Sequence, residues 1–253
     1  MKPLISVITP THRRPDLLYR CIKAVQKSDL KNYEHIVVGD NCPFAEKVVN
    51  LFDDDRIKYY SSPSPHIKNV GAVGKNIGIK NATSDYIVYC DDDNIILPNH
   101  LSVVYEELSK GTDICRINMC EIDIDVIGNG SIKKVLEYGI PNLDNVSGRV
   151  HRNDMQCYGH TKKVIESVGF WNTSTEISKD KTWTRNAVGE DDYLIRKFKN
   201  SGVFDNIVDL PDVSFIYFGR GACVNGDEEY DNGLSNKSLF VYPNLIKKLD
   251  LYA

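Results

Sequence analysis

The first half of the chain alternates short apolar runs with amphipathic segments. Leu4–Thr9 is predicted to be a buried strand that stops at Pro10, and the apolar spacing after Pro15 predicts a helix. Such alternation is typical of βαβ units, whose parallel strands share one sheet. The pattern predicts further strands at Glu34–Val38, Ile57–Tyr60 and Tyr86–Cys90, and further helices at Phe44–Phe52, at Val70–Ile79 and from Pro98.

The second half has a mixed pattern without repeats or a low-complexity linker. It predicts strands at Asp113–Asn118, Glu121–Ile127, Asn206–Asp209 and Val213–Phe218, and helices at Lys162–Val168, Glu190–Asn200 and Leu239–Leu251. No break separates two domains, so we expect one α/β domain over residues 1–253. We divide it into a first part (1–112), a second part (113–225) and a C-terminal extension (226–253).

Composition narrows the class of protein. The 253 residues are 42% hydrophobic and 26% charged, which is enough apolar material for one large core. A net charge of −4 gives no general attraction to a nucleic-acid backbone, so nucleic acid is not an expected partner. The sequence shows neither a leader peptide nor a membrane-spanning run, so we expect a cytoplasmic protein. Peripheral membrane contact and the oligomeric state stay open.

The seven cysteines are scattered and include no CxxC pair. We interpret them as reduced thiols set mostly in apolar runs, and we expect no structural zinc site.

Polar residues follow three of the predicted parallel strands. They are Thr9, Thr11 and His12 after the first strand, Asp40 and Asn41 after the second, and Asp91 to Asp93 after Tyr86–Cys90. Ligands of open parallel sheets bind at the carboxyl ends of the strands, so these residues are expected to form one site.

The three consecutive aspartates repel one another unless a cation or several N–H groups neutralise them. Their oxygen atoms suit Mg²⁺ or Mn²⁺ bound together with a diphosphate. The alternative is an acidic turn that caps the following helix, and the triplet alone leaves this open.

Two further segments carry charge at positions that suggest a site. Lys75 lies between Gly74 and Gly78, where the backbone could approach a phosphate, although a solvated lysine is the simpler interpretation. Glu190 and Asp191 open a predicted helix, where the helix dipole favours carboxylates even without a function.

These segments, in order, resemble family 2 glycosyltransferases with the GT-A fold over roughly residues 3–220. The similar runs are SVITPTHRR, VVGDNC, GKNIGI, DYIVYCDDDNIILPNHL and VIESVGFWN followed by VGEDDYLIRKF. The run DDNIILP is especially similar to the spore-coat polysaccharide glycosyltransferase type. Asn94 departs from the family's pattern, which often has a further acid there, and Lys75 stands where the family often has Arg.

The resemblance implies a GT-A fold, with a Rossmann-like and mostly parallel central sheet and a smaller mixed acceptor-side sheet. It makes residues 1–112 the nucleotide-sugar-binding half and residues 113–225 the acceptor-binding half. It implies an inverting enzyme that moves a sugar from a nucleoside diphosphate sugar to a hydroxyl of a glycan or glycoconjugate. The donor that it favours is a UDP-sugar. The implied cofactor is Mn²⁺ or Mg²⁺, bound by Asp93 most directly and by Asp91. The implied catalytic base is Asp191, with Glu190 beside it and Asp192 as a further alternative. The residues implied to bind the nucleotide sugar are Thr9, Pro10, Thr11, Asp40, Lys75, Asp91, Asp92 and Arg220.

Other residues have two interpretations each. Arg220 is either part of a mobile lid over the diphosphate or an exposed loop residue. Trp171 and Trp183 bracket a loop that could line the acceptor cleft, although Trp171 also suits a core, and His160 is more simply structural. Two other functions are weighed: a sugar-phosphate nucleotidyltransferase, whose glycine-rich phosphate loop is not seen after Thr9, and a non-catalytic sugar-nucleotide or glycan-binding module.

Overall fold

The structure is a computed structural model that describes residues 2–62, 70–124, 132–138, 154–179 and 190–218. Its strands form one nine-stranded sheet in the order β3-β2-β1-β4-β8-β6-β9-β5, with β7 paired to β6. The strands are β1 (Ile5–Thr11), β2 (Tyr33–Asp40), β3 (Ile57–Ser62), β4 (Tyr86–Tyr89), β5 (Ile95–Ile96), β6 (Ile114–Ile124), β7 (Ile132–Tyr138), β8 (Tyr158–Thr161) and β9 (Val208–Phe218). The helices are α1 (Pro15–Gln26), α2 (Ala45–Val49), α3 (Val70–Asn81), α4 (His100–Ser109), α5 (Lys162–Val168), α6 (Ser174–Lys179) and α7 (Glu190–Asn200), with 3₁₀ turns η1 (Met155–Cys157) and η2 (Val203–Asn206).

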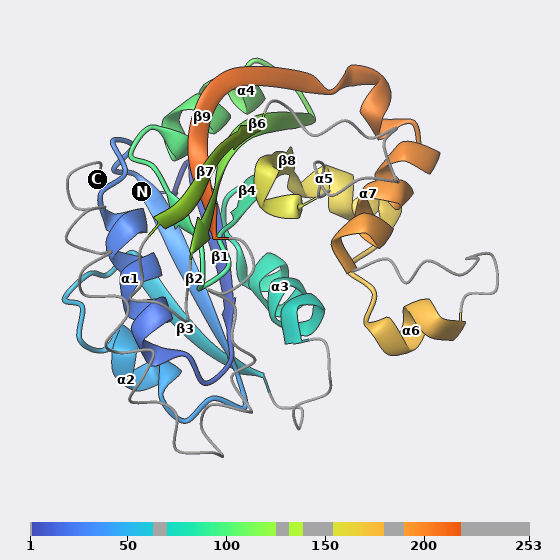
Figure 1. Cartoon of the computed structure of the whole chain (residues 1–253). Coiled ribbons are helices and arrows are strands. Elements are labelled where there is room, and N and C mark those ends of the chain that lie inside the picture. Colours follow the sequence, from blue (N-terminus) through green and yellow to red (C-terminus); the bar gives the residue numbers. More distant parts are fainter. Residues whose placement is uncertain (1, 63–69, 125–131, 139–153, 180–189, 219–253) are drawn as a thin grey trace.

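The N-terminal part of the sheet is parallel. β1 pairs in parallel with β2 and β4, and β2 pairs in parallel with β3. Helices α1 and α2 cover one face of these strands and α3 covers the other (Figure 1). The alternation in the sequence therefore predicted the βαβ units and the α/β class correctly.

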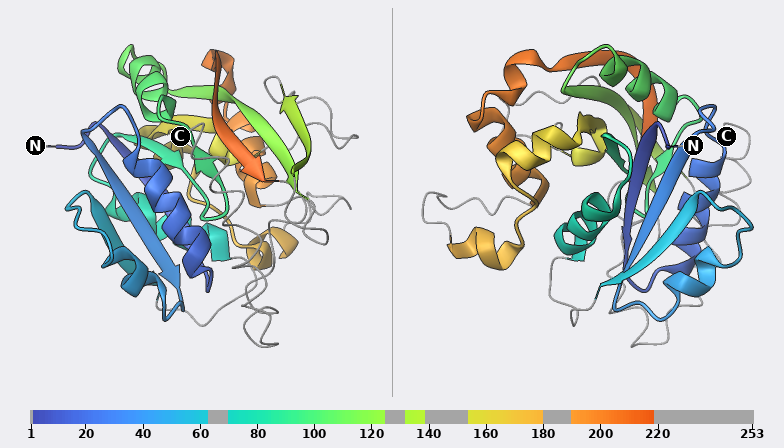
Figure 2. Two further views of the ribbon diagram at one scale, coloured as in Figure 1. Left: turned by 60° about the vertical axis from the view of Figure 1, so that its left-hand side comes forward. Right: turned by 180° about the vertical axis from the view of Figure 1, so that it is seen from behind.

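The other part of the sheet is mixed and continues from the parallel part through β8. This short strand is antiparallel to both β4 and β6, whereas β9 runs parallel to β6. β6 and β9 run side by side and arch toward the C-terminal helices (Figure 2). Because β8 is antiparallel to β4, the residues just before β8 lie next to the carboxyl end of β4. The three aspartates follow β4 at this end.

Several predicted boundaries were wrong. β1 does not stop at Pro10 but continues to Thr11, since the fixed φ of proline fits an extended strand and only its missing N–H is lost. The helix expected from Pro98 begins at His100, and the short strand β5 precedes it. The helix predicted over Phe44–Phe52 is confined to Ala45–Val49.

Two predicted strand pairs are in fact single strands. Asp113–Asn118 and the described part of Glu121–Ile127 belong to β6, and Val208–Phe218 runs through Pro211 as β9. The β6–β9 pairing shifts register on both sides of Asn118. Such register shifts are typical of β-bulges, which leave the strands paired on both sides of the irregularity. Asn206 belongs to η2, and the predicted helix Leu239–Leu251 lies outside the described residues.

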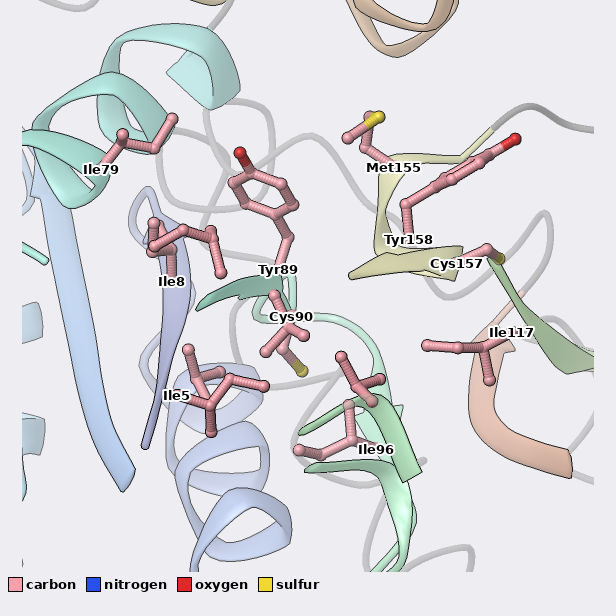
Figure 3. Packing of buried hydrophobic residues seen from close by; sticks show 14 of the residues in the cluster. Ile5, Ile8, Ile79, Tyr89, Cys90, Ile96, Ile117, Met155, Cys157 and Tyr158 are labelled. Atoms are coloured by element: carbon pink, nitrogen blue, oxygen red, sulfur yellow. The ribbon is translucent and has the colours of Figure 1, made fainter. Parts of the chain in front are cut away.

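The main core lies around β4, between β1 and the η1–β8 segment. Figure 3 shows Tyr89 and Cys90 of this region between Ile5 and Ile8 on one side and Met155 and Tyr158 on the other. All of these side chains are buried. The carboxyl end of β4 is thus held within the main hydrophobic core.

Glycines bring α3 close to β1. A methyl group added at Gly78 would overlap Ile8 Cγ2, and one added at Gly74 would lie 2.9 Å from Pro10 Cβ. Larger side chains would push the helix outward. Lys75 consequently stands close to the carboxyl end of the parallel strands.

Within the described residues, no helix is long and apolar enough to cross a membrane. The cysteines Cys21, Cys42, Cys90, Cys115 and Cys157 are buried and unbridged, as expected for reduced thiols.

Candidate active site

The three aspartates follow β4 directly and are largely withdrawn from solvent. Asp92 is fully buried, Asp93 is 7% exposed, and the side chain of Asp91 keeps 26% exposure. The Asn94 N–H donates to the Asp91 carbonyl at 3.0 Å, which closes a tight turn. The turn directs Asp91 toward one cation and directs Asp92 and Asp93 toward another.

Asp92 and Asp93 face Arg14, which follows β1. The Arg14 guanidinium lies 2.5 Å from Asp92 Oδ1 and 3.0 Å from Asp93 Oδ2. Thr11 Oγ1 also donates to Asp92 Oδ2 at 2.6 Å. Burial raises the pKa of Asp92, and Arg14 partly opposes that rise. This half of the triplet is thus bound within the protein by a bridging arginine.

Asp91 faces Lys75, which also contacts Asp191. The Lys75 Nζ lies 3.5 Å from Asp91 Oδ1 and 3.4 Å from Asp191 Oδ1. The same Nζ stands 4.2 Å from the centroid of the Trp171 ring, within cation–π range. Lys75 is 4% exposed, so the structure places it inside the protein and not in solvent.

Glu190 and Asp191 begin α7 but point to different partners. Glu190 Oε2 accepts a hydrogen bond of 3.0 Å from the Ala72 N–H near the start of α3. Asp191 is 31% exposed at its side chain and directs Oδ1 toward Lys75. Glu190 therefore ties α7 to α3, and Asp191 is the one whose carboxylate both meets Lys75 and stays accessible.

The electrostatic balance around Lys75 is unequal, because one ammonium faces four carboxylates: Asp91, Asp154, Glu190 and Asp191. Burial alone would lower the pKa of Lys75, but these carboxylates raise it above its ordinary value. Burial raises the pKa of Asp91 to about 6 and that of Glu190 to about 7. Burial and the nearby carboxylates also raise the pKa of Asp154. The ammonium of Lys75 by itself therefore does not neutralise these four carboxylates.

Two residues of this site were not found by sequence reasoning: Asp154 and Gln156. Both are buried at the turn η1, just before β8. Gln156 Nε2 donates to Asp91 Oδ2 at 2.9 Å, and Gln156 Oε1 accepts from the Asp91 N–H at 2.7 Å. No recognised motif covers this short segment, and the one available signal was Asp154, an acid four positions before a strand that the pattern did not predict.

Trp171 and His160 are structural. Trp171 is 3% exposed and its Nε1 donates to Tyr89 Oη at 3.2 Å, while Tyr89 Oη lies 2.9 Å from His160 Nε2. Asn76 of α3 holds the Trp171 backbone through two hydrogen bonds of 2.9 Å. Trp171 therefore supports Lys75 from within the core and does not line an open cleft. Trp183 lies outside the described residues.

The remaining predicted residues lie at strand ends or outside the described part. Thr9 is fully buried, and its hydroxyl contacts the Cys90 carbonyl at 2.7 Å and His35 Nε2 at 2.8 Å, inside the sheet. Pro10 is buried against α3, and Asp40, 3% exposed, ends β2 with its carbonyl 2.7 Å from His12 Nδ1. Arg220 lies outside the described residues.

The carboxylate oxygens that follow β4 suit a hard divalent cation. Asp91 Oδ1 is buried and makes no hydrogen bond in the described structure, and carboxylate oxygens are what Mg²⁺ and Mn²⁺ prefer. No group of three or more metal-ligating side chains is already assembled among the described residues. The residues fit such an ion in kind, although they are arranged around Lys75.

Comparisons with known proteins agree on one family. Residues 6–161, more than half of the 253-residue chain, match the sequence profile described as glycosyl transferase family 2. A Campylobacter jejuni relative, GalNAc(5)-diNAcBac-PP-undecaprenol beta-1,3-glucosyltransferase, is 38% identical over 112 residues. The match covers 43% of this chain and 36% of that protein, so the chain spans little more than a third of the relative.

Solved structures are similar in fold at low sequence identity. S. aureus TarS in complex with UDP superposes with a TM-score of 0.62 at 16% identity, over 87% of this chain and 61% of TarS. Mannosyltransferase PcManGT from Pyrobaculum calidifontis, in complex with GDP-Man and Mn²⁺, gives a TM-score of 0.57 at 13% identity, over 98% of this chain and 65% of that one.

Proposed function

Because the chain belongs to glycosyl transferase family 2 and has the GT-A fold, we propose that it transfers a sugar from a nucleoside diphosphate sugar to a hydroxyl of a glycan or glycoconjugate. The observation that carries this proposal is the meeting of Asp91 and Asp191 at Lys75 Nζ, 3.5 Å and 3.4 Å away. The carboxylate that follows β4 and the carboxylate near the start of α7 therefore lie beside the same ammonium group. That arrangement suits a diphosphate on one side and an acceptor on the other.

In the proposed reaction Asp191 is the general base. Its side chain is 31% exposed, so an acceptor hydroxyl can reach it, and its carboxylate can take the hydroxyl proton as the oxygen attacks the anomeric carbon. The bond from that carbon to the diphosphate oxygen breaks in the same step, so the anomeric centre inverts. Glu190 and Lys75 hold Asp191 in place from the α3 side.

Donor binding is assigned to the carboxyl ends of the parallel strands. Thr9, Pro10 and Thr11 of β1 and Asp40 of β2 would border the nucleoside, with the hydroxyl of Thr9 committed inside the sheet. Lys75, Asp92 and Arg220 complete the proposed nucleotide-sugar set. Asp91 and Asp93 would hold Mn²⁺ or Mg²⁺, which supplies positive charge beside the leaving diphosphate when bound. Arg14 must then share Asp93 with the ion.

The similar proteins indicate which ligands to test first. TarS was solved with UDP and PcManGT with GDP-Man and Mn²⁺, while the Campylobacter relative is named for a glucosyl transfer to an undecaprenol-linked glycan. We propose a UDP-sugar as donor, GDP-mannose as the comparison, and an acceptor from polysaccharide or lipid-linked glycan synthesis, reached in the cytoplasm or at a membrane surface.

A thermal-shift screen tests the proposal. The protein is heated with UDP, GDP, UDP-sugars and GDP-mannose, with and without Mn²⁺. A ligand at about 100 times its Kd stabilises the folded state by about 2.7 kcal/mol, so the true donor raises Tm by several degrees. We expect the rise to require Mn²⁺ or Mg²⁺. No rise with any nucleotide diphosphate would contradict the proposal, and binding without transfer or donor hydrolysis would indicate a non-catalytic module.

A further inference from the structure

Gln156 is a buried amide beside the acidic triplet, and the proposed reaction has not used it. Its side chain is 1% exposed and projects from η1, the turn that leads into β8. The Gln156 N–H donates to Asp154 Oδ1 at 2.9 Å, and the Cys157 N–H donates to the Asp154 carbonyl at 3.0 Å. These two hydrogen bonds hold the backbone at Gln156 independently of the contacts that its side chain makes.

Both ends of the Gln156 amide bind the segment after β4. Oε1 accepts from the Asp91 N–H at 2.7 Å and from Asn94 Nδ2 at 3.1 Å, and Nε2 donates to Asp91 Oδ2 at 2.9 Å. A backbone N–H can only donate, so the amide atom that faces it is the oxygen. This contact fixes the orientation of the amide, and Nε2 must then face the carboxylate.

The two oxygens of the Asp91 carboxylate therefore have different surroundings. Oδ2 is held by Gln156, whereas Oδ1 makes no hydrogen bond in the described structure and lies 3.5 Å from Lys75 Nζ. A carboxylate held at one oxygen cannot rotate freely, so the other oxygen keeps one direction. That direction is toward Lys75, which Asp191 also contacts.

We propose that Gln156 is a positioning residue, which holds Asp91 so that Oδ1 stays available to a divalent cation and the diphosphate it accompanies. This inference rests on the proposed function, because it assigns a partner to one of the proposed metal ligands. Gln156 acts through Asp91 and touches neither substrate nor ion. The same amide also grips Asn94, so it fixes the start and the end of the turn that carries the triplet.

The test measures Mn²⁺ affinity directly, through the electron paramagnetic resonance signal of free Mn²⁺ during titration in the presence of UDP. Gln156→Met keeps the length of the side chain and removes all three amide contacts. We expect Mn²⁺ to bind about 10- to 100-fold more weakly, the usual effect of losing a group that orients a metal ligand. Tm without Mn²⁺, measured in parallel, should fall by only a few degrees.

A matched control is available at Gln26, whose Nε2 also donates to an aspartate, Asp54, at 2.8 Å. Gln26→Met should leave Mn²⁺ affinity unchanged. A double-mutant cycle sharpens the result: in an Asp91→Asn background, Gln156→Met should cause no further loss, because its effect passes through Asp91.

Three outcomes would overturn the inference. Unchanged Mn²⁺ affinity in Gln156→Met would do so while the proposed function stands. A full additional loss in the Asp91→Asn background would show that Gln156 acts elsewhere. If the wild-type protein itself bound no Mn²⁺ with UDP or GDP, the proposed metal dependence would fall together with this inference. Should Gln156→Met not fold, Gln156→Glu keeps the acceptor for the Asp91 N–H and replaces only the donor, and at least a 10-fold loss is again expected.

Discussion

Asp91 and Asp92 are neighbours in the sequence, yet their carboxylates face different cations and differ in the balance of charge around them. Asp92 is fully buried and closed off by Arg14 and Thr11, at 2.5 Å and 2.6 Å. Asp91 is partly exposed and meets Lys75, whose single ammonium serves four carboxylates. We call the first environment the arginine side and the second the lysine side.

The difference teaches that the acidic triplet is not one uniform cluster. On the arginine side, the bridging guanidinium offsets much of the negative charge, so those contacts mainly hold the turn in place. On the lysine side, negative charge exceeds positive charge, and Asp91 and Asp191 keep some exposure. An excess of buried negative charge next to solvent is where a cation and a reacting group are expected.

The largest effect is expected from Asp191→Asn on the lysine side. The amide cannot take a proton from the acceptor hydroxyl, so turnover should fall about 100- to 10,000-fold, while the nucleotide affinity stays nearly unchanged. Transfer kinetics and calorimetry with UDP and Mn²⁺ measure the two quantities separately.

The control for this prediction is Asp205→Asn, an exposed aspartate in η2, which should behave as wild type. Asp191 is not the base if Asp191→Asn retains activity. The same conclusion follows if the loss appears in Asp192→Asn instead.

A smaller effect, on stability, should separate the two sides. Lys75→Met and Arg14→Met each leave buried carboxylates without a cation, so each should lower the free energy of unfolding at pH 8 by about 3–5 kcal/mol. Mn²⁺ with UDP should restore much of the loss in Lys75→Met, because an ion held by Asp91 brings positive charge to where the ammonium stood. It should restore less in Arg14→Met, because an ion at Asp93 leaves Asp92, which is fully buried, without a cation.

Thermal melts of both variants with and without Mn²⁺ and UDP provide this measurement. Equal rescue of the two variants would remove the distinction between the arginine side and the lysine side.

The smallest effect concerns the pH dependence of the metal-free protein. Burial raises the pKa of Asp91 to about 6 and of Glu190 to about 7, whereas unfolded carboxyls titrate near 4. Between these limits these carboxyls bind more protons in the folded state than in the unfolded state, so their contribution to stability falls as pH rises from about 5 to 8. Burial lowers the pKa of His35, His100 and His160, so these histidines act in the opposite direction up to about pH 6.5, their ordinary value. The carboxyl contribution is therefore measured as a difference between the wild type and a variant that lacks one of these carboxyls.

Glu190→Gln sharpens the pH prediction, because the glutamine oxygen can still accept from the Ala72 N–H but no longer titrates. From pH 5 to 8 the Tm of this variant should fall less, or rise more, than that of the wild type, by at least about 2 °C, the shift that roughly 1 kcal/mol produces in a chain of this size. An unchanged pH dependence in Glu190→Gln would contradict the picture of surplus carboxylates. The range stops at pH 5 because Glu34 acts in the opposite direction at lower pH. Hydrogen bonds, that with Lys58 first, outweigh burial and lower the pKa of Glu34 to about 2. Its contribution to the stability of the folded state is therefore lost as pH falls below this range.

Much of the fold could be predicted from the sequence, because helices and strands leave their own periods in it. The strand at Tyr86, the helix after Pro15 and the glycine-bearing helix at Val70 were all predicted and found. Strand β8 was missed because its four residues, Tyr158–Thr161, are too short to show a period. The single strands β6 and β9 were each predicted as two strands, because their pairing shifts register at Asn118 and so interrupts the regular alternation along them.

The sequence by itself determined that acids follow β4 and that Glu190 and Asp191 begin α7, since both depend on neighbouring residues. Only the tertiary structure decided which oxygen is held and which is left available. Lys75 and Asp191 are 116 positions apart, and Asp91 and Gln156 are 65 apart. Local patterns report which face of a segment is buried, but a pairing across such separations depends on how β8, α3 and α7 pack around the end of β4.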